Sequence, residues 1–221
     1  MSASDDEPGE PTALPMLAIY ADESCLGNGR EGSNPGAAAG VIEFVHPDSG
    51  NLTRWDYWVS EPGTTNNRMA LRSVIEAFNG ISRKGSRFRV TFTSDSQYLV
   101  KGMSEWVFGW MSRGWKKKEG ELLNVELWMD AVEAVRGHQV QWNWVRGHDG
   151  HPQNEYANYL ATTAAKEQTS SNGIASSRFD EWMLTEREKK KISVAPQKFP
   201  DGAAFKPLRP YPIVKRPALI T

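Results

Sequence analysis

The 221-residue chain has a formal net charge of −1, with 39% hydrophobic and 24% charged residues, which is typical of soluble globular proteins. No apolar run approaches the roughly 20 residues needed to cross a bilayer, so we expect no membrane segment. The N-terminus lacks the basic and apolar regions of a signal peptide. A single cysteine, Cys25, excludes an internal disulfide and a cysteine-rich metal site. We therefore expect a cytoplasmic protein, and a monomer.

The charge is distributed unevenly along the chain. Nine lysines and arginines lie between residues 187 and 221 against two acids, so this tail carries about +7 and the rest of the chain about −8. The first ten residues add four acids. This polarity has two interpretations. The tail either binds a nucleic-acid or protein partner, or it is solvated and disordered and only keeps the protein soluble.

The hydrophobic pattern predicts an α/β fold. Short apolar or alternating runs predict strands over 16–22, 36–45, 51–60, 87–95 and 138–148. Apolar residues at spacings of three and four predict a helix over 64–81. Further helices are predicted over 96–118, where glycines interrupt the pattern, over 122–135, which is amphipathic, and over 152–167, where Pro152 lies near the start. The order of these elements implies a mixed five-stranded sheet flanked by helices.

The chain divides into three predicted segments. Residues 1–15 are acidic and rich in proline and glycine, and we expect them to be disordered. Residues 16–167 contain the whole predicted sheet and form one domain. Residues 168–221 form a linker and a basic, proline-rich C-terminal extension. Within this extension, residues 179–190 predict a short helix, and six prolines further on disfavour regular structure.

Six motifs follow one another along the domain. They are YADESCLGN (20–28), TTNNRMAL (64–71), TSDSQYLVKG (93–102), a W-x3-W-x4-W-K run (106–116), LLNVELW (122–128) and WNWVRGHDGHPQNEYANYLA (142–161). In this order they resemble the type 1 ribonuclease H family, over about two thirds of the chain. The resemblance implies a ribonuclease H-like fold. It also implies Mg²⁺-dependent hydrolysis of the RNA strand of an RNA–DNA hybrid, with four carboxylates holding two metal ions.

Two of these four carboxylate positions are replaced. Asp22 and Asp95 match the acids of the first and fourth strands. Ala70 stands where the family has a glutamate on the first helix, and Asn158 where it has an aspartate on the last. Asn158 keeps an oxygen that can bind a metal, whereas the methyl group of Ala70 offers no ligand. With Asp22, Asp95 and Asn158 as the metal set, we expect a degenerate active site in which the second ion binds poorly and Mn²⁺ partly replaces Mg²⁺.

Three neighbouring acids could in principle replace a lost ligand. Glu76 should face away on the first helix, whereas Glu155 lies one turn before the replaced aspartate, on roughly the same side. Glu23 follows Asp22 directly on a strand, so we expect it to point to the opposite face and not to reach the metal. We therefore expect Ala70→Glu to raise Mg²⁺-dependent cleavage at least tenfold, about 1.4 kcal/mol of barrier.

The remaining matched positions concern proton transfer and substrate binding. His148 matches a histidine of a mobile loop with a proton-transfer role, and its flanking glycines favour this role over a structural one. The positions matched to minor-groove and 2′-OH contacts are Cys25, Asn28, Asn66, Asn67 and Gln97. Those matched to a DNA-phosphate pocket are Thr65 and Asn124, and those matched to a basic handle are Trp106, Trp110, Trp115, Arg113, Lys116, Lys117 and Lys118. Trp106 and Trp110 equally fit a place in the core, and His46 and His138 fit the surface.

Two functions therefore stand open. The chain is either an Mg²⁺-dependent endonuclease for RNA–DNA hybrids, weakened by its altered site, or a non-catalytic hybrid-binding or partner-platform protein that acts through its tail. Position 70 is the feature that distinguishes them, because family membership alone does not fix function.

Overall fold

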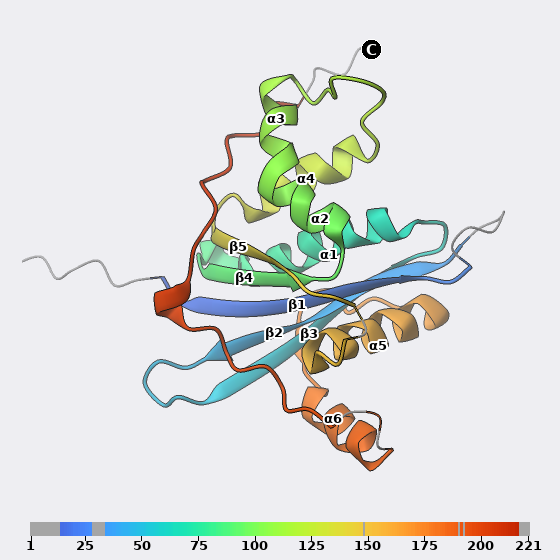
Figure 1. The fold of residues 1–221 in the computed structure, drawn as a ribbon, viewed down its shortest axis with the longest axis vertical. Helices are drawn as coiled ribbons and strands as arrows, with labels where there is room; N and C mark the ends of the chain where they lie inside the picture. Colours follow the sequence, from blue (N-terminus) through green and yellow to red (C-terminus); the bar gives the residue numbers. More distant parts are fainter. Residues whose placement is uncertain (1–13, 28–33, 148, 190, 192, 217–221) are drawn as a thin grey trace, which may run out of the picture.

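The computed structural model describes residues 14–27, 34–147, 149–189, 191 and 193–216. Predictions for residues 1–13, Asn28 and His148 lie outside these ranges. A six-stranded sheet with the strand order β5-β4-β1-β2-β3-β6 forms the centre. Helices α1–α4 lie on one face of the sheet, and α5 and α6 lie on the other (Figure 1).

All five predicted strands are present. The central strand β1 pairs in parallel with β4 and antiparallel with β2, and β5 and β3 continue the sheet on either side. A sixth strand was not predicted, because it has only two residues and no detectable period; it pairs with β3 from within the predicted linker. The strands are β1 (Met16–Cys25), β2 (Gly36–Val45), β3 (Leu52–Glu61), β4 (Arg89–Ser94), β5 (Gln139–Trp144) and β6 (Ala175–Ser176).

The helices also follow the predicted order. The run predicted over 96–118 is an α-helix that passes through a π-helical turn at Gly102–Trp106 into α3. A side chain at Gly102 would collide with the Trp128 ring, so the glycine lets this helix pack against α4. The helices are α1 (Asn66–Ile81), α2 (Gln97–Lys101), α3 (Val107–Ser112), α4 (Val125–Val135), α5 (Pro152–Glu167) and α6 (Phe179–Glu188), with 3₁₀ turns at Arg83–Gly85 and Gly202–Ala204.

Small residues on β2 bring α5 close to the sheet. Ala37 is fully buried against Ala164 and Ala165 of α5. On the α1 face of the same strand, a Cβ added at Gly40 would lie 2.6 Å from the Tyr57 hydroxyl, so only glycine leaves room for this ring. This face of the sheet, toward α1 and α4, carries the larger core of aliphatic and aromatic side chains.

The described part of the C-terminal extension packs against the domain. The backbone N–H of Leu208 donates to a carbonyl of β5 at 2.8 Å. The buried Tyr211 hydroxyl donates to the Met103 carbonyl (2.8 Å) and accepts from the Trp142 indole (2.7 Å). The Arg216 guanidinium pairs with two acids of α4. The alternative of a fully solvated, disordered tail is therefore wrong for the described part of this segment.

His138 is not the surface residue that we expected. It is half-buried at the start of β5, where its Nδ1 accepts from the Phe88 N–H (3.2 Å) and its Nε2 lies 2.9 Å from the Ser82 hydroxyl. Burial lowers its pKa to about 4, so the ring is neutral and structural at pH 7. His46 is exposed as expected.

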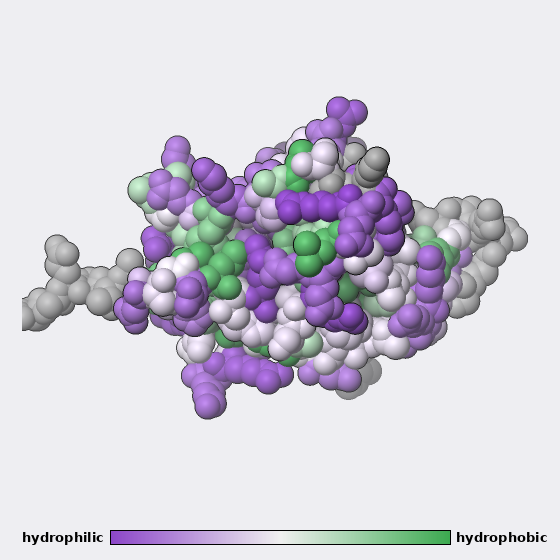
Figure 2. Space-filling model, turned by 90° about the horizontal axis from the view of Figure 1, so that it is seen from below, coloured by the Kyte–Doolittle hydropathy of each residue, from purple (hydrophilic) through white to green (hydrophobic). Residues whose placement is uncertain are grey.

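Polar residues predominate on the face that bears α5 and α6, where hydrophobic residues form separate patches (Figure 2). Among the described residues, no helix is both long and apolar enough to cross a membrane.

Candidate active site

Parallel pairing of β1 and β4 brings the two matched aspartates together. Asp22 lies near the C-terminal end of β1, and Asp95 directly follows β4. Both therefore lie at the end of the sheet where these two parallel strands finish. One carboxylate oxygen from each of Asp22, Glu23 and Asp95 lies within 4.8 Å of the other two. The structure therefore assembles three carboxylates at this end of the sheet, one more than the matched positions provide.

The expectation that Glu23 cannot reach the site is wrong. The alternation along β1 does hold: the Glu23 charge acts on Tyr57, whose hydroxyl bonds to Ser73 of α1, so Glu23 lies on the α1 face of the sheet. However, the cluster lies beyond the last β4 residue, where side chains from both faces of the sheet can meet. The long glutamate side chain can therefore bring its carboxylate to Asp22 and Asp95.

Ala70 lies where the family resemblance places a helix glutamate. It is fully buried in the core between α1 and the sheet. Glu23 also reaches the site from this α1 face, and it supplies a carboxylate that α1 lacks. A glutamate at position 70 would therefore have to displace packed apolar neighbours, as well as share the site with Glu23.

Helix α5 presents one line of polar residues to the end of β1. The Asn154 amide donates to an Asp22 carboxylate oxygen at 3.3 Å. Two turns later the Thr162 hydroxyl donates to Ser24 at 3.2 Å. Asn158 lies one turn from each of these residues, so it belongs to the same face of the helix, between the contact with Asp22 and the contact with Ser24.

The cluster repels itself electrostatically. Burial raises the pKa of Asp22 to about 8, and repulsion from Asp95 adds to the shift, with a smaller contribution from Glu155. The Glu23 N–H donates to Asp22 at 2.7 Å and opposes this shift. Burial together with the charges of Asp22 and Asp95 raises the pKa of Glu23 as well. A bound cation would relieve this repulsion, and the all-oxygen donor set suits Mg²⁺ or Mn²⁺.

A second polar site lies on the α1–α4 side of the molecule. It is a pocket of about 410 Å³ that brings together residues from α1, the handle and the start of α4. Asn124 adopts a left-handed conformation (φ 59°) at the start of α4, and its amide donates to the Tyr98 hydroxyl at 3.4 Å. The lining residues are Asn67, Tyr98, Trp106, Trp110, Lys117, Leu122, Leu123 and Asn124.

Tyr98 lines this pocket, but it was not among the substrate-binding positions expected from the family resemblance. It lies within the motif over residues 93–102, but the motif gives no sign that its hydroxyl bridges two other side chains. That hydroxyl also accepts from the Trp128 indole at 3.0 Å.

The tryptophans of the predicted handle differ in exposure. Trp110 and Trp115 are buried, at 7% and 6% exposure, whereas Trp106 is half-buried at the pocket. Lys116, Lys117 and Lys118 are exposed. The two buried rings therefore belong to the core of this segment, and the lysines form its exposed basic surface.

The other matched positions lie at the starts of helices or at a strand end. Thr65 is exposed, and its hydroxyl caps α1 by accepting from the Arg68 N–H at 3.4 Å. Asn66 begins α1 and Gln97 begins α2, where Gln97 is exposed. Cys25 is half-buried at the end of β1, and burial raises its pKa to about 11, so the thiol is neutral.

Comparison with known proteins agrees with this geometry. The sequence model of the RNase H family matches residues 15–166. The chain belongs to the ribonuclease H family. A ribonuclease H of Herminiimonas arsenicoxydans is 42% identical over 150 residues, which cover 67% of this ribonuclease H and 93% of that protein.

Solved structures extend the comparison. The crystal structure of LC9-RNase H1, described as a type 1 RNase H with the type 2 active-site motif, superposes with a TM-score of 0.86 at 54% identity. That match covers 95% of this chain and 100% of the other, so it extends into the C-terminal extension. LC11-RNase H1, solved in complex with an RNA/DNA hybrid, shares the fold at 18% identity, with a TM-score of 0.50 over 69% of this chain and 98% of that one.

Proposed function

We propose that this ribonuclease H is an active endonuclease that hydrolyses the RNA strand of RNA–DNA hybrids. The observation that carries the proposal is the approach of the Asp22, Glu23 and Asp95 carboxylates to within 4.8 Å of one another. In this proposal Glu23 takes the place of the helix glutamate that Ala70 lacks. The description of LC9-RNase H1 as a type 1 enzyme with the type 2 active-site motif supports such an exchange, since that protein is 54% identical to this one.

The site fits a divalent cation. Asp22, Glu23 and Asp95 would hold it, with Asn158 as an oxygen donor from α5. A pair of bound divalent ions supplies an activated water and stabilises the leaving oxygen of the phosphodiester. The chain itself orients the ligands: Asn154 fixes one Asp22 oxygen, and the Glu23 N–H fixes the other. Asn158 keeps only a neutral donor, so we expect the second ion to bind more weakly than the first.

The non-catalytic alternative loses its main support. It rested on a site reduced to two charged ligands, and Glu23 supplies a third. The tail, which would carry the platform function, packs along β5 and α4 in its described part.

We further propose that hybrid recognition uses the matched residues at the starts of α1 and α2. Asn66, Asn67 and Gln97 would contact 2′-OH groups, which distinguish RNA from DNA. The pocket at Asn124 and the lysines of the handle would hold phosphates of the DNA strand. The complex of LC11-RNase H1 with an RNA/DNA hybrid shows that this fold can bind such a duplex. We propose a monomeric, cytoplasmic enzyme.

Single-turnover cleavage of an end-labelled hybrid tests the proposal. We expect the RNA strand to be cut with Mg²⁺ and with Mn²⁺, no cleavage in EDTA, and none of a DNA duplex of the same sequence. Asp95→Asn is the inactive control. Tight hybrid binding without cleavage in either metal would favour the non-catalytic alternative.

A further inference from the structure

Helix α6 forms one wall of a groove that lies beside the candidate active site. The family match ends at residue 166, so α6 is an addition to the family domain. An open groove of about 700 Å³ lies between α5 and the end of α6. Its lining includes Asn158, Thr162 and Lys166 from α5, and Trp182, Lys189 and Lys191 from α6 and the residues that follow it.

The groove borders the face of α5 that meets the end of β1, where the carboxylate cluster lies. Asn158 lines its inner end and also belongs to the face of α5 that approaches β1. Thr162, one turn further, bonds to Ser24, the residue after Glu23. Lys166 follows after one more turn, in the last turn of α5. A strand leaving the cluster along α5 would therefore run directly into the groove.

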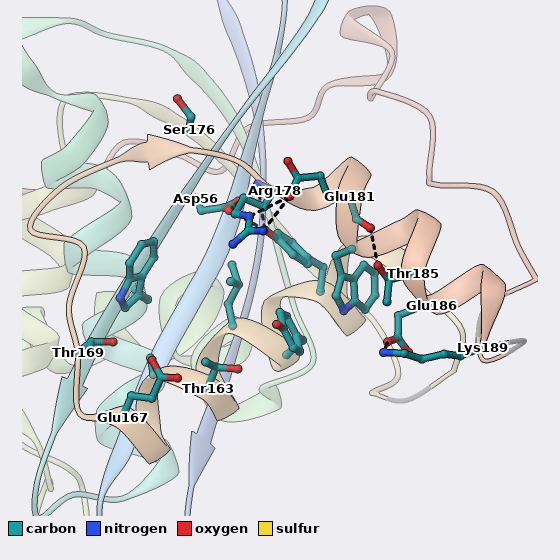
Figure 3. Close-up of a pocket in the computed structure, with 16 residues that line it drawn as sticks. Asp56, Thr163, Glu167, Thr169, Ser176, Arg178, Glu181, Thr185, Glu186 and Lys189 are labelled. Carbon is teal, nitrogen blue, oxygen red and sulfur yellow. Dashed lines mark hydrogen bonds and ion pairs between the residues drawn. The ribbon is translucent and has the colours of Figure 1, made fainter.

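The outer part of the groove is basic. Lys166, Lys189 and Lys191 are exposed. The acid between them, Glu186, is mostly buried and already pairs with both Lys189 (3.0 Å) and Lys191 (3.9 Å). Figure 3 shows the adjoining pocket, where Glu186 and Lys189 project from α6 on the side that faces α5. With Glu186 paired, the lysines give the outer groove a net positive charge.

The two walls are held firmly together, and aromatic rings lie between them. Tyr159 of α5, which is 49% exposed, lies 6.1 Å from the ring of Trp182. At the start of α6, Phe179 is buried beneath the Arg54 guanidinium, which also pairs with Asp180 at 2.9 Å. These contacts fix α6 against the domain, and Tyr159 and Trp182 give the groove an aromatic lining.

We propose that this groove binds the RNA strand of the hybrid where it leaves the active site. Lys166, Lys189 and Lys191 would contact phosphates beyond the reach of the family domain, without reading sequence. The RNA strand is favoured over the DNA strand because Asn158 and Thr162 of α5 line the groove and also lie on the face of α5 that approaches the proposed site of RNA cleavage. The pocket proposed for DNA phosphates lies on the opposite face of the sheet, near α1 and α4. This inference rests on the proposed function.

The test compares two charge-matched double variants. Lys189→Ala with Lys191→Ala removes two groove lysines, and Lys198→Ala with Lys206→Ala removes two exposed lysines of the extension that do not line the groove. Hybrid binding is measured by fluorescence anisotropy in EDTA across a salt series, with thermal melts to confirm that both variants fold. The slope of log K against log salt is negative, and each lost phosphate contact should reduce its magnitude by roughly 0.9. The groove variant should therefore have a slope shallower by about 1.8 and an affinity about tenfold lower at low salt.

Substrate length then locates the contact. Two hybrids are compared, in which the RNA strand extends on only one side or only the other side of a single cleavable position. The groove variant should lose affinity for one of these hybrids and not for the other. Any of three results would overturn the groove assignment. They are an equal loss of affinity in both double variants, an unchanged salt slope in the groove variant, and a loss that does not depend on which side of the RNA strand is extended. Starting protein that binds hybrid no better than DNA duplex would instead overturn the proposed function, and this inference with it.

Discussion

Replacing Glu23 by glutamine should lower the cleavage activity and raise the stability of the metal-free protein. Glutamine keeps the shape of the side chain and one oxygen, but removes the negative charge. If Glu23 is a metal ligand, the variant should lose Mg²⁺-dependent cleavage. In the absence of metal, the same change should stabilise the fold, because it removes one of three carboxylates that repel one another.

The geometry sets the expected size of both effects. Two unit charges about 4 Å apart interact by about 4 kcal/mol at an effective dielectric of about 20. An ion held among oxygens within 4.8 Å of one another is at least this close to each carboxylate. Losing one charge should therefore cost about 4 kcal/mol, roughly a thousandfold in single-turnover rate at low Mg²⁺. Without metal, the free energy of unfolding at pH 8 should rise by about 1–3 kcal/mol, since the change removes a buried carboxyl whose pKa is raised by burial and by repulsion from Asp22 and Asp95.

The assays are single-turnover cleavage over a Mg²⁺ titration, and urea unfolding in EDTA. Glu155→Gln is the matched control, because this acid also acts on Asp22 but more weakly. Cleavage by Glu23→Gln at the rate of the starting protein would refute the assignment of Glu23 as a ligand. A variant that loses both activity and stability would point instead to a packing role.

The same reasoning reverses the earlier expectation for Ala70→Glu. In the starting protein Glu23 already supplies the carboxylate, and overpacking a fully buried position costs about 1–3 kcal/mol. We now expect Ala70→Glu alone to leave cleavage unchanged or lower. It should restore activity only where Glu23 has been replaced by a small residue, which a two-by-two set of variants would reveal.

Three further results are expected. Removing residues 193–221 should lower the free energy of unfolding by about 3 kcal/mol, because the buried Tyr211 and its two hydrogen bonds are lost; an unchanged urea midpoint would contradict this. The pKa of Asp22 is raised to about 8, so its contribution to metal-free stability is complete below about pH 4 and is lost as the pH rises through 8. In thermal melts from about pH 4 to 9, Asp22→Asn should therefore reduce the dependence of the melting temperature on pH. Asn67→Ala should erode the preference for hybrid over DNA duplex in competition binding, whereas Lys117→Ala should weaken both alike, and equal effects would argue against 2′-OH recognition by Asn67.

The sheet and its helices could be predicted because their periods are local. Alternation marks β3 and β5, and spacings of three and four mark α1, so element order alone implied the fold. The pairing of Asp22 with Asp95 was expected from the family resemblance, and the parallel pairing of β1 with β4 provides it. Glu23 could not be placed in the same way, because the rule of alternating faces describes strand interiors, and the cluster lies just past the end of β4.

Burial within the handle was also beyond local reasoning. The spacing of Trp110 and Trp115 fits a binding handle as well as a core, and tertiary packing places both rings inside. His138 is similar: no neighbour in sequence indicates that its ring bonds to Ser82 and Phe88, which lie some 50 residues earlier. Such contacts depend on which loops the sheet brings together, and the single sequence does not specify that.

The C-terminal extension shows why such contacts matter for the whole fold. The five long strands form an open sheet with two edges, β5 and β3, and unpaired edges invite association with other chains. Here β6 pairs with β3 at Trp55 and Asp56 and so covers part of that edge. At the other edge Leu208 donates to the carbonyl of β5 residue Val140, and the backbone of Lys206 donates to a β5 side chain. Residues beyond the family match therefore protect both edges of the sheet and, between these two contacts, carry the helix that forms one wall of the groove beside the candidate active site.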